Sequence, residues 1–323
     1  MGVIDLSLTL ITGANGFIGQ RLMGKNCIGL IRNNNQLKKD YIVGDLMNFG
    51  SLVAAFRQVE TIVHCAGHTH SQKVGNDRMH WQVNLEGTKN VMRAAVNAGV
   101  KNVIFLSSVK AMGEAGSDCV DESFTGRYTN VYGQSKRAAE EVVLEFGARH
   151  KIHTVCLRLA MVYGRGSKGY LSRMVKGIEN NWFPPVPDTG NKRSLVHVID
   201  VVSAIKFAIR DPAANGQIFI VADKETYSTR EIYDAIKKVL GKKPLIFGEQ
   251  FSIPSYFFAT GGKVGDYFIE KFGLPFPIST EMVERLLNSE CYSSAKFSRA
   301  VGWQPKINLL NGLREMTHVK FDQ

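Results

Sequence analysis

The sequence lacks the features that would place the chain in or across a membrane. It has no run of 18 apolar residues, the length that a membrane-spanning helix needs. Its first residues, MGVIDLSLTLITG, have neither the basic segment nor the long apolar core of a secretory signal. We find no internal repeat and no low-complexity tract, and 44% of the residues are hydrophobic. These absences predict a globular protein in the cytoplasm.

The cysteines lack the number and spacing of a disulfide scaffold. There are five, an odd number, and no CxxC pair occurs. Both facts argue against a disulfide framework, which small secreted domains use in place of a large core. We therefore expect free thiols and a reducing compartment.

The chain also lacks a long basic run, although its formal net charge is +11. A nucleic-acid-binding protein usually concentrates positive charge on one face or arm, whereas here both halves share the excess. We therefore expect no nucleic-acid partner. An even positive charge fits attraction for a small polyanion, such as a dinucleotide or a sugar diphosphate.

The 323 residues are enough for about two domains. In the first half, continuous apolar runs alternate with segments of helical spacing, which predicts a parallel sheet covered by helices on both faces. We predict an α/β fold with a doubly wound Rossmann sheet in residues 1–165, to which residues 193–222 return. Residues 166–323 are predicted to form mainly a smaller C-terminal α/β substrate domain. Ser51 and Thr229 are predicted to cap two helices.

A glycine-rich loop follows the first apolar run. Its spacing is GxxGxxG, and glycine permits a tight turn and a close approach of the backbone to a pyrophosphate. A helix that starts in this loop would present backbone N–H groups to the anion. The loop residues predicted to bind a dinucleotide are Gly13, Asn15, Gly16, Phe17, Ile18 and Gly19.

The end of the second apolar run bears on the kind of dinucleotide. NAD-specific sites usually carry an acid there for the ribose 2′-hydroxyl. This chain instead reads Leu30-Ile31-Arg32-Asn33-Asn34. Arg32 is suited to pair with a 2′-phosphate, so we predict NADP(H) or NAD(H) as the cofactor, with NADP(H) favoured.

Three polar residues predict proton transfer. Tyr132 and Lys136 are four positions apart, so on a helix they share one face. An ammonium nearby favours the phenolate of a tyrosine, which can then act as a base, and the lysine can also hold the nicotinamide ribose. Ser107 and Ser108 end the fifth apolar run, at the strand end where open α/β sheets bind ligands. We predict that Tyr132, Lys136 and Ser108 are catalytic.

The motifs together resemble the extended short-chain dehydrogenase/reductases, which include nucleotide-sugar epimerases, dehydratases and reductases. The resemblance runs from about residue 8 to residue 317. Besides the glycine loop and Tyr132–Lys136, it is carried by Gly44-Asp45, His64-Cys65-Ala66-Gly67, Asn84-Leu85-Glu86-Gly87-Thr88, Arg193-Ser194-Leu195-Val196 and Val301-Gly302-Trp303-Gln304-Pro305. A finer match, Ser107-Ser108-Val109-Lys110-Ala111-Met112-Gly113-Glu114, is similar to a bacterial subgroup resembling UDP-glucose 4-epimerases and used for surface-polysaccharide sugars.

This resemblance implies roles for further residues. Asp45 and Leu46 would approach the adenine, and Cys65, Ala66 and Gly67 would line the ribose and nicotinamide side. His70 and Ser108 would contact the substrate, and Arg193 would lie near its nucleotide or diphosphate. The resemblance also implies a homodimer, and a nucleotide-sugar substrate or one carried on a lipid diphosphate.

The residues after Ser108 separate the chemistries open to such a protein. A sugar 4,6-dehydratase of this family needs an acid and a base beside the catalytic hydroxyl, whereas this chain has Val109 and Lys110. The sequence therefore predicts a 4-epimerase or a 4-keto-sugar reductase, and it leaves these two open. The alternatives are an NADPH-dependent reductase of a hydrophobic ketone, such as a flavonoid or steroid, and a non-catalytic NADP-binding sensor.

Two further clusters have simpler interpretations. His64, His68, His70 and His80 raise the question of a metal, but the chemistry requires none, so we expect no metal site. Aromatic residues are frequent in 251–278. We expect this segment to pack as a cap on the substrate domain rather than to contact a membrane or a lipid carrier.

Overall fold

The computed structural model describes residues 8–32, 39–69, 77–242 and 280–317, together with Thr260 and Asp266. His70 lies outside the described residues, as does the aromatic segment 251–278 apart from Thr260 and Asp266. What the sequence predicts for both therefore stays a prediction.

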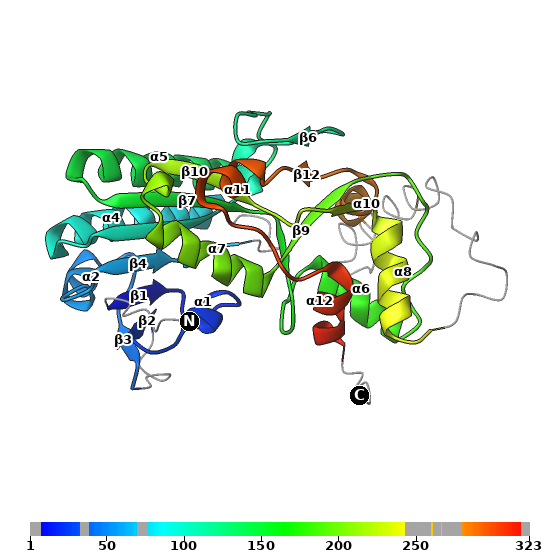
Figure 1. Cartoon of the computed structure of the whole chain (residues 1–323), viewed down its shortest axis with the longest axis horizontal. Coiled ribbons are helices and arrows are strands. Elements are labelled where there is room, and N and C mark those ends of the chain that lie inside the picture. Colours follow the sequence, from blue (N-terminus) through cyan, green and yellow to red (C-terminus); the bar gives the residue numbers. More distant parts are fainter. Residues whose placement is uncertain are drawn as a thin grey trace.

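A seven-stranded parallel sheet forms the larger part of the molecule (Figure 1). Its strand order is β10-β7-β5-β4-β1-β2-β3. The strands are β1 (Thr9–Thr12), β2 (Cys27–Ile31), β3 (Tyr41–Val43), β4 (Thr61–His64), β5 (Asn102–Ser108), β7 (His153–Leu159) and β10 (Gln217–Val221). The order reverses between β1 and β4, and such a reversal opens a crevice for ligands at the carboxyl ends of the strands. The predicted Rossmann fold is confirmed.

Helices cover both faces of this sheet. One layer consists of α2 (Phe49–Ala55), α4 (Gly87–Ala98) and α5 (Val131–His150). The opposite layer includes α1 (Gly19–Leu22), α7 (Val198–Arg210) and α11 (Ala295–Val301). The shorter helical elements of this part of the chain are α3 (Asp77–Met79), the π-helix η2 (His80–Glu86) and the 3-10 helices η3 (Val109–Met112) and η4 (Pro212–Ala214). In the described ranges, no helix has the length and apolar character needed to cross a membrane.

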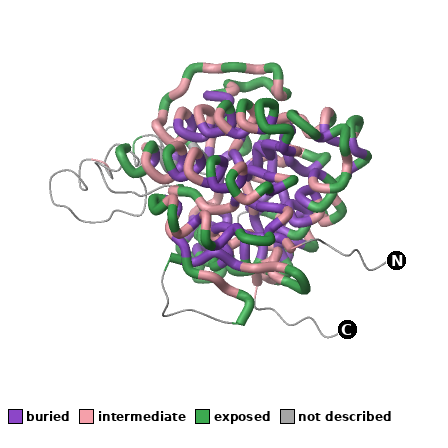
Figure 2. Tube along the Cα trace, turned by 90° about the vertical axis from the view of Figure 1, so that its left-hand side faces the viewer, coloured by how far each residue is buried: buried purple, intermediate pink, exposed green. Residues whose placement is uncertain are grey.

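Successive strand residues alternate between the two layers. Leu10 of β1 belongs to the core beneath α2, α4 and α5, whereas Ile11 belongs to the core beneath α7. Phe105 and Leu106 of β5 divide in the same way. Figure 2 shows the buried positions concentrated in the middle of the molecule. Because both faces are covered, these strands carry apolar residues toward both layers rather than only at every second position.

In the described ranges, a smaller unit contains a three-stranded sheet and four helices. Its strands are β8 (Met161–Tyr163), β9 (Arg193–His197) and β11 (Thr226–Tyr227), in the order β11-β9-β8. Its helices are α6 (Tyr170–Glu179), α8 (Thr229–Val239), α10 (Thr280–Leu287) and α12 (Leu309–Met316). A third core, which includes Met174, Leu195 and Leu313, joins these elements.

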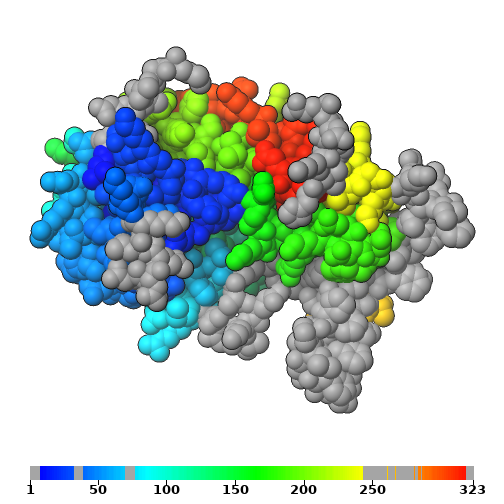
Figure 3. All heavy atoms as spheres, turned by 90° about the horizontal axis from the view of Figure 1, so that it is seen from below, coloured from blue at the N-terminus to red at the C-terminus, as the bar shows by residue number. Residues whose placement is uncertain are grey.

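The smaller unit meets the glycine-loop side of the large sheet at Arg21. The guanidinium of Arg21 donates to the carbonyl oxygens of Phe17, at 2.5 Å, and of Arg165. Figure 3 shows the N-terminal segment, in blue, adjoining green and red parts of the chain. Arg21 therefore connects the loop predicted to bind the cofactor with the segment that follows β8.

Both predicted helix caps are wrong, one by three positions and the other by one. The N-cap of α2 is Asn48, whose side chain accepts from the Ser51 backbone N–H at 3.1 Å. The N-cap of α8 is Ser228, which forms a capping box with Glu231, while the Thr229 hydroxyl donates to the Leu286 carbonyl oxygen. Several side chains able to cap lie close together at each start, and composition alone does not choose among them.

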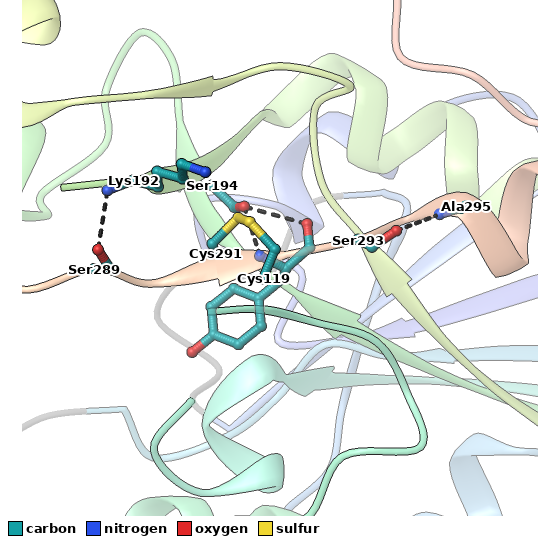
Figure 4. The surroundings of a disulfide bond; sticks show 8 residues. Cys119, Lys192, Ser194, Ser289, Cys291, Ser293 and Ala295 are labelled. Atoms are coloured by element: carbon teal, nitrogen blue, oxygen red, sulfur yellow. Dashed lines mark hydrogen bonds between the residues drawn. A yellow bond between two sulfur atoms is a disulfide. The ribbon is translucent and has the colours of Figure 1, made fainter. Parts of the chain in front are cut away.

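The structure also contradicts the expectation that no disulfide forms. Cys119 and Cys291, separated by 172 residues, form a disulfide between β6 (Cys119–Val120) and β12 (Cys291–Tyr292) (Figure 4). These two strands pair in parallel, which aligns the two cysteines in register. Cys27, Cys65 and Cys156 are free. The odd number of cysteines therefore reflects one pair plus three free thiols, and it does not argue for a reducing compartment.

Candidate active site

The strand end of β5 and the start of α5 bring the predicted catalytic residues together. Ser108 is the last residue of β5, and Tyr132 is the second residue of α5. The two side chains share a hydrogen bond. Asn130 caps α5 by accepting from the Gly133 N–H at 2.7 Å, so the helix begins immediately before Tyr132. The Asn130 cap thus places Tyr132 in the first turn of α5.

Lys136 lies one helical turn after Tyr132 and is buried. Its ammonium donates to the Leu106 carbonyl oxygen at 2.7 Å and stands 4.5 Å from the centre of the Phe105 ring. Burial lowers the pKa of Lys136 to about 8, and the carboxylate of Glu140 opposes that change. The lysine therefore remains charged at neutral pH but is close to losing its proton.

The surroundings of Tyr132 affect the protonation of its phenol in two opposite ways. Burial raises the pKa of Tyr132, and the hydrogen bond from Ser108 works in the opposite direction. The phenol is therefore protonated in the ligand-free protein. A base at this position depends on additional positive charge from its surroundings.

A buried ionic network supports α5 behind Lys136. Glu140 accepts from Arg158 through both carboxylate oxygens, at 2.9 and 2.8 Å, and from the Ser107 hydroxyl at 2.6 Å. Neither Glu140 nor Arg158 belongs to a motif that predicts this network from the sequence. The spacing of Glu140 four residues after Lys136 was the available signal, because it places both side chains on one helix face.

Backbone crowding explains the glycines of the GxxGxxG loop. Gly13 has a φ of +67°, and a Cβ atom there would lie 2.9 Å from backbone atoms of Ala66. A Cβ atom on Gly19 would lie 2.3 Å from the Gly13 carbonyl oxygen. The loop therefore folds tightly and packs directly against the chain that leaves β4.

A hydrogen-bonded chain links β1, β4 and the helix η2–α4 beneath the site. The Thr12 hydroxyl and His64 Nδ1 are 2.7 Å apart, and His64 Nε2 is 3.0 Å from the Thr88 hydroxyl. Thr88 donates in turn to the Asn84 carbonyl oxygen. Burial, assisted by the charge of Lys136, lowers the pKa of His64 to about 3. His64 is therefore a neutral residue of the framework.

Asn84 extends this framework to α5, the helix that carries Tyr132 and Lys136. Its amide donates to the Ser135 hydroxyl at 3.0 Å and to the His68 carbonyl oxygen at 3.1 Å. Ser135 donates to the Tyr132 carbonyl oxygen at 2.8 Å. The π-helical turn that contains Asn84 thus contacts the first turn of α5. The sequence analysis quoted Asn84 only as part of a motif and gave it no role.

Most of the chain matches one known protein family. Residues 9–222 match the family described as "NAD dependent epimerase/dehydratase family". The chain belongs to that family. It is therefore an NAD-dependent enzyme of the short-chain dehydrogenase/reductase type.

Relatives in the epimerase/dehydratase family align along nearly the whole chain. The chain is 27% identical to a UDP-glucose 4-epimerase of Vibrio cholerae, over 95% of this chain and 93% of the relative. It is 26% identical to N-acetyl-alpha-D-glucosaminyl-diphospho-ditrans,octacis-undecaprenol 4-epimerase of Escherichia coli O157:H7, over 97% and 96%. A solved UDP-glucose 4-epimerase of Thermotoga maritima, with UDP-glucose, has a TM-score of 0.74 at 19% identity, covering 95% of this chain and 96% of that chain.

The epimerase/dehydratase family implies a bound dinucleotide, and the residues present fit one. A Cβ atom on Gly67 would lie 3.2 Å from Asn84 Oδ1 and 3.4 Å from Lys136 Nζ. Glycine at this position therefore leaves room beside the lysine ammonium. Gly67 follows β4, whose neighbour β1 leads into the glycine loop, so both segments border the crevice where the strand order reverses.

The remaining predicted cofactor residues lie along the same strand ends. Arg32 is exposed immediately after β2. Asp45 follows β3, and its carboxylate accepts from the Met47 N–H at 2.9 Å, while Leu46 is buried. Cys65 and Ala66 follow β4, and burial raises the pKa of the Cys65 thiol to about 12, so the thiol stays neutral. Asn15, Phe17 and Ile18 lie between the loop glycines.

Arg193 occupies a different setting from the catalytic residues. It begins β9 in the smaller unit, is buried, and pairs with Glu290 at 3.0 Å. Glu290 also pairs with Lys110, two residues after Ser108. Arg193 is therefore connected to the carboxyl end of β5 through the carboxylate of Glu290, a residue that no sequence motif marks.

His68 and His80 lie side by side, with their ring centroids 4.7 Å apart. His80 Nδ1 is 3.1 Å from the His68 carbonyl oxygen, and its ring packs 5.7 Å from that of Tyr132. Across residues 8–32, 39–69, 77–242 and 280–317, no group of three or more His, Cys, Asp or Glu residues is placed to hold a metal ion.

Proposed function

We infer that this enzyme interconverts the C4 epimers of a sugar carried on a diphosphate, through transient oxidation at C4. The hydrogen-bonded Ser108–Tyr132 pair beside the buried Lys136 ammonium carries this proposal. That arrangement suits the exchange of one proton with a hydroxyl or carbonyl oxygen. The 4-epimerases among the relatives support C4 as the reacting carbon.

Tyr132 exchanges the proton in this proposal. A bound nicotinamide supplies the hydride acceptor and donor. Tyr132, as phenolate, takes the proton of the C4 hydroxyl while the carbon is oxidised, and returns it after the ketone has turned its other face. Lys136 stabilises the phenolate by its charge, and Ser108 donates a hydrogen bond to the reacting oxygen.

A turnover assay separates this proposal from the reductase that the sequence left open. The enzyme is incubated with UDP-glucose or UDP-N-acetylglucosamine and a substoichiometric amount of cofactor, and the sugars are then analysed by NMR. Epimer interconversion without net consumption of reduced cofactor supports the epimerase. Stoichiometric oxidation of NADPH by a 4-keto sugar would establish the reductase instead. Tyr132→Phe should lower the rate by at least about a hundredfold, because the general acid–base is removed.

The finer choice of cofactor is NADP(H) in this proposal. Arg32 is exposed at the end of β2, the position at which an NAD site usually carries an acid. Titration of the protein with NADPH and NADH tests this choice. Arg32→Ala should weaken the binding of NADPH much more than the binding of NADH. Tighter binding of NADH than of NADPH by the unaltered protein would overturn the preference.

The proposal also includes a homodimer that supplies precursors of surface polysaccharides. Sedimentation analysis tests the dimer, and sugar analysis of a strain lacking the gene tests the pathway. A cytoplasmic location stays a prediction. The disulfide counts against it, because such bonds persist mainly in oxidising compartments.

A further inference from the structure

Two cations and one carboxylate meet between the catalytic strand end and the smaller unit. Glu290 Oε1 contacts the Lys110 ammonium, and Glu290 Oε2 lies 3.0 Å from Arg193 Nη2. Lys110 belongs to η3, which starts directly after Ser108, and the Ser108 hydroxyl accepts from the Lys110 backbone N–H at 3.2 Å. One carboxylate thus joins the catalytic side to the residue expected near the substrate's diphosphate.

The backbone holds Glu290 in this position. Its N–H donates to the Lys192 carbonyl oxygen at 2.7 Å, and its own carbonyl oxygen accepts from the Ser194 N–H at 2.8 Å. The next residue, Cys291, is fixed by the disulfide and by strand pairing with β6 (Figure 4). The backbone of Glu290 is therefore held in place beside Lys110 and Arg193. The carboxylate can separate from these cations by rotation of the Glu290 side chain alone.

The cluster can be reached by a ligand. The side chains of Lys110 and Glu290 are 33% and 25% exposed, whereas that of Arg193 is only 4% exposed. The Tyr170 hydroxyl is buried and interacts electrostatically with Arg193. Among the described residues this hydroxyl has no hydrogen-bond partner. Arg193 and Tyr170 thus provide a buried charge and a buried donor behind a carboxylate that is open to solvent.

A carboxylate that bridges two cations occupies them much as a phosphate would. We propose that Lys110 and Arg193 together bind a diphosphate and that Glu290 is a built-in competitor, which occupies this subsite until the diphosphate displaces it. The proposal rests on the proposed function for the nature of the ligand, and it adds Lys110 and Glu290 to the residues that select it.

Competition by Glu290 has a consequence for specificity. An anion gains affinity only to the extent that it satisfies the two cations better than the carboxylate does. A diphosphate offers more charge and more oxygens than the carboxylate, whereas a single carboxylate or a monoanionic phosphate offers little advantage. The subsite therefore discriminates in favour of diphosphates.

Calorimetric titration with inorganic pyrophosphate tests this proposal on the full chain. Glu290→Gln should bind pyrophosphate at least about tenfold more tightly than the unaltered protein, because the competitor loses its charge. Lys110→Gln should weaken binding by a similar factor. Glu60→Gln is the matched control, because Glu60 pairs with Lys101 at 2.9 Å on the surface. It should leave pyrophosphate binding unchanged.

Unchanged or weaker pyrophosphate binding by a folded Glu290→Gln protein would overturn the proposal and leave the cluster as a structural brace. Should that variant fail to fold, Lys110→Gln decides alone, and undiminished binding by it has the same meaning. These titrations do not depend on turnover. Tighter binding by Glu290→Gln together with absent epimerase activity would reject the proposed function and keep the subsite.

Two further ligands identify the group attached to the diphosphate. UDP represents a nucleotide sugar, and farnesyl diphosphate represents a lipid carrier. Glu290→Gln should tighten the binding of both ligands, because both contain a diphosphate. The ligand that the unaltered protein binds more tightly than pyrophosphate identifies the carrier, and weaker binding of both than of pyrophosphate would reject a diphosphate ester as the ligand.

Discussion

Arg158 and Glu140 form a bidentate ion pair in the interior, one helical turn beyond Lys136. Arg158 Nε lies 2.9 Å from Glu140 Oε1, Arg158 Nη2 lies 2.8 Å from Oε2, and neither side chain is more than 1% exposed. Because Glu140 also raises the pKa of Lys136, the pair connects the support of α5 with the charge of that lysine.

Removal of the Glu140 charge should destabilise the protein. Glu140→Gln leaves the Arg158 guanidinium buried beside a neutral amide, a change that typically costs about 3–5 kcal/mol. Denaturant unfolding measures the loss. Glu141→Gln is the matched control, because Glu141 is the next residue, is exposed, and pairs with Arg137 at 3.1 Å. Equal stability of the two variants would contradict the role assigned to the buried pair.

The activity should decline above about pH 8. Burial lowers the pKa of Lys136 to about 8, so its ammonium loses the proton above that pH and no longer favours the Tyr132 phenolate. The measurement is kcat/KM for epimer interconversion between pH 6 and pH 10. Lys136→Arg keeps its charge throughout this range. It should react more slowly but lack the decline, and a decline that persists in the variant would assign it to another group.

Asp223 should make the fold less stable as the pH rises. Burial, with the neighbouring Asp200, raises the pKa of Asp223 to about 8 from 3.8. Between these values the folded protein keeps a proton that the unfolded chain releases, so stability falls as pH increases through this window.

Asn cannot ionise, so Asp223→Asn should be more stable than the unaltered protein at pH 8 and should show a flatter dependence on pH. Each unit of pKa shift that is relieved corresponds to about 1.4 kcal/mol. Thermal unfolding at pH 5 and pH 8 provides the measurement. The exposed Asp118→Asn serves as control, and a parallel pH dependence in all three proteins would rule out Asp223 as the cause.

Reduction of the Cys119–Cys291 disulfide should lower the free energy of unfolding by about 2–4 kcal/mol. The bond restricts the unfolded chain, so its loss favours unfolding. Unfolding with and without a thiol reductant measures the effect. The double variant Cys119→Ser/Cys291→Ser should be insensitive to the reductant. Labelling of five thiols, rather than three, in the protein unfolded without a reductant would show that the bond is not formed.

The sequence predicted those parts of the site that depend on local pattern. The glycine loop and the Tyr132–Lys136 pair each follow from spacing within one element, and Ser108 follows from its place at the end of an apolar run. The structure places the glycine loop and Ser108 at the carboxyl ends of β1 and β5, and Tyr132 and Lys136 on α5. Their assigned roles remain proposals. The Rossmann sheet was predictable because buried parallel strands are apolar at every position.

The features missed by the sequence analysis depend on partners far apart in the chain. Arg193 and Glu290 are adjacent only because β9 and β12 come together in the fold, and Cys119 meets Cys291 across 172 residues. The spacing of residues within one element does not predict contacts between distant parts of the chain. The helix caps failed for the opposite reason, because Asn48 competes with Ser51, and Ser228 with Thr229, within a single turn.

The disulfide between β6 and β12 divides the chain into a covalent ring with two tails. Helix α5, strand β10 and helix α8 belong to the ring, whereas the glycine loop lies on the N-terminal tail and α12 on the C-terminal tail. Cleavage by a protease anywhere between the two cysteines would open the ring but leave one covalent molecule. Such a cut would become visible on a denaturing gel only after reduction. A cut between Cys119 and Tyr132 would separate Tyr132 from Ser108 along the backbone, while the disulfide kept both in one molecule.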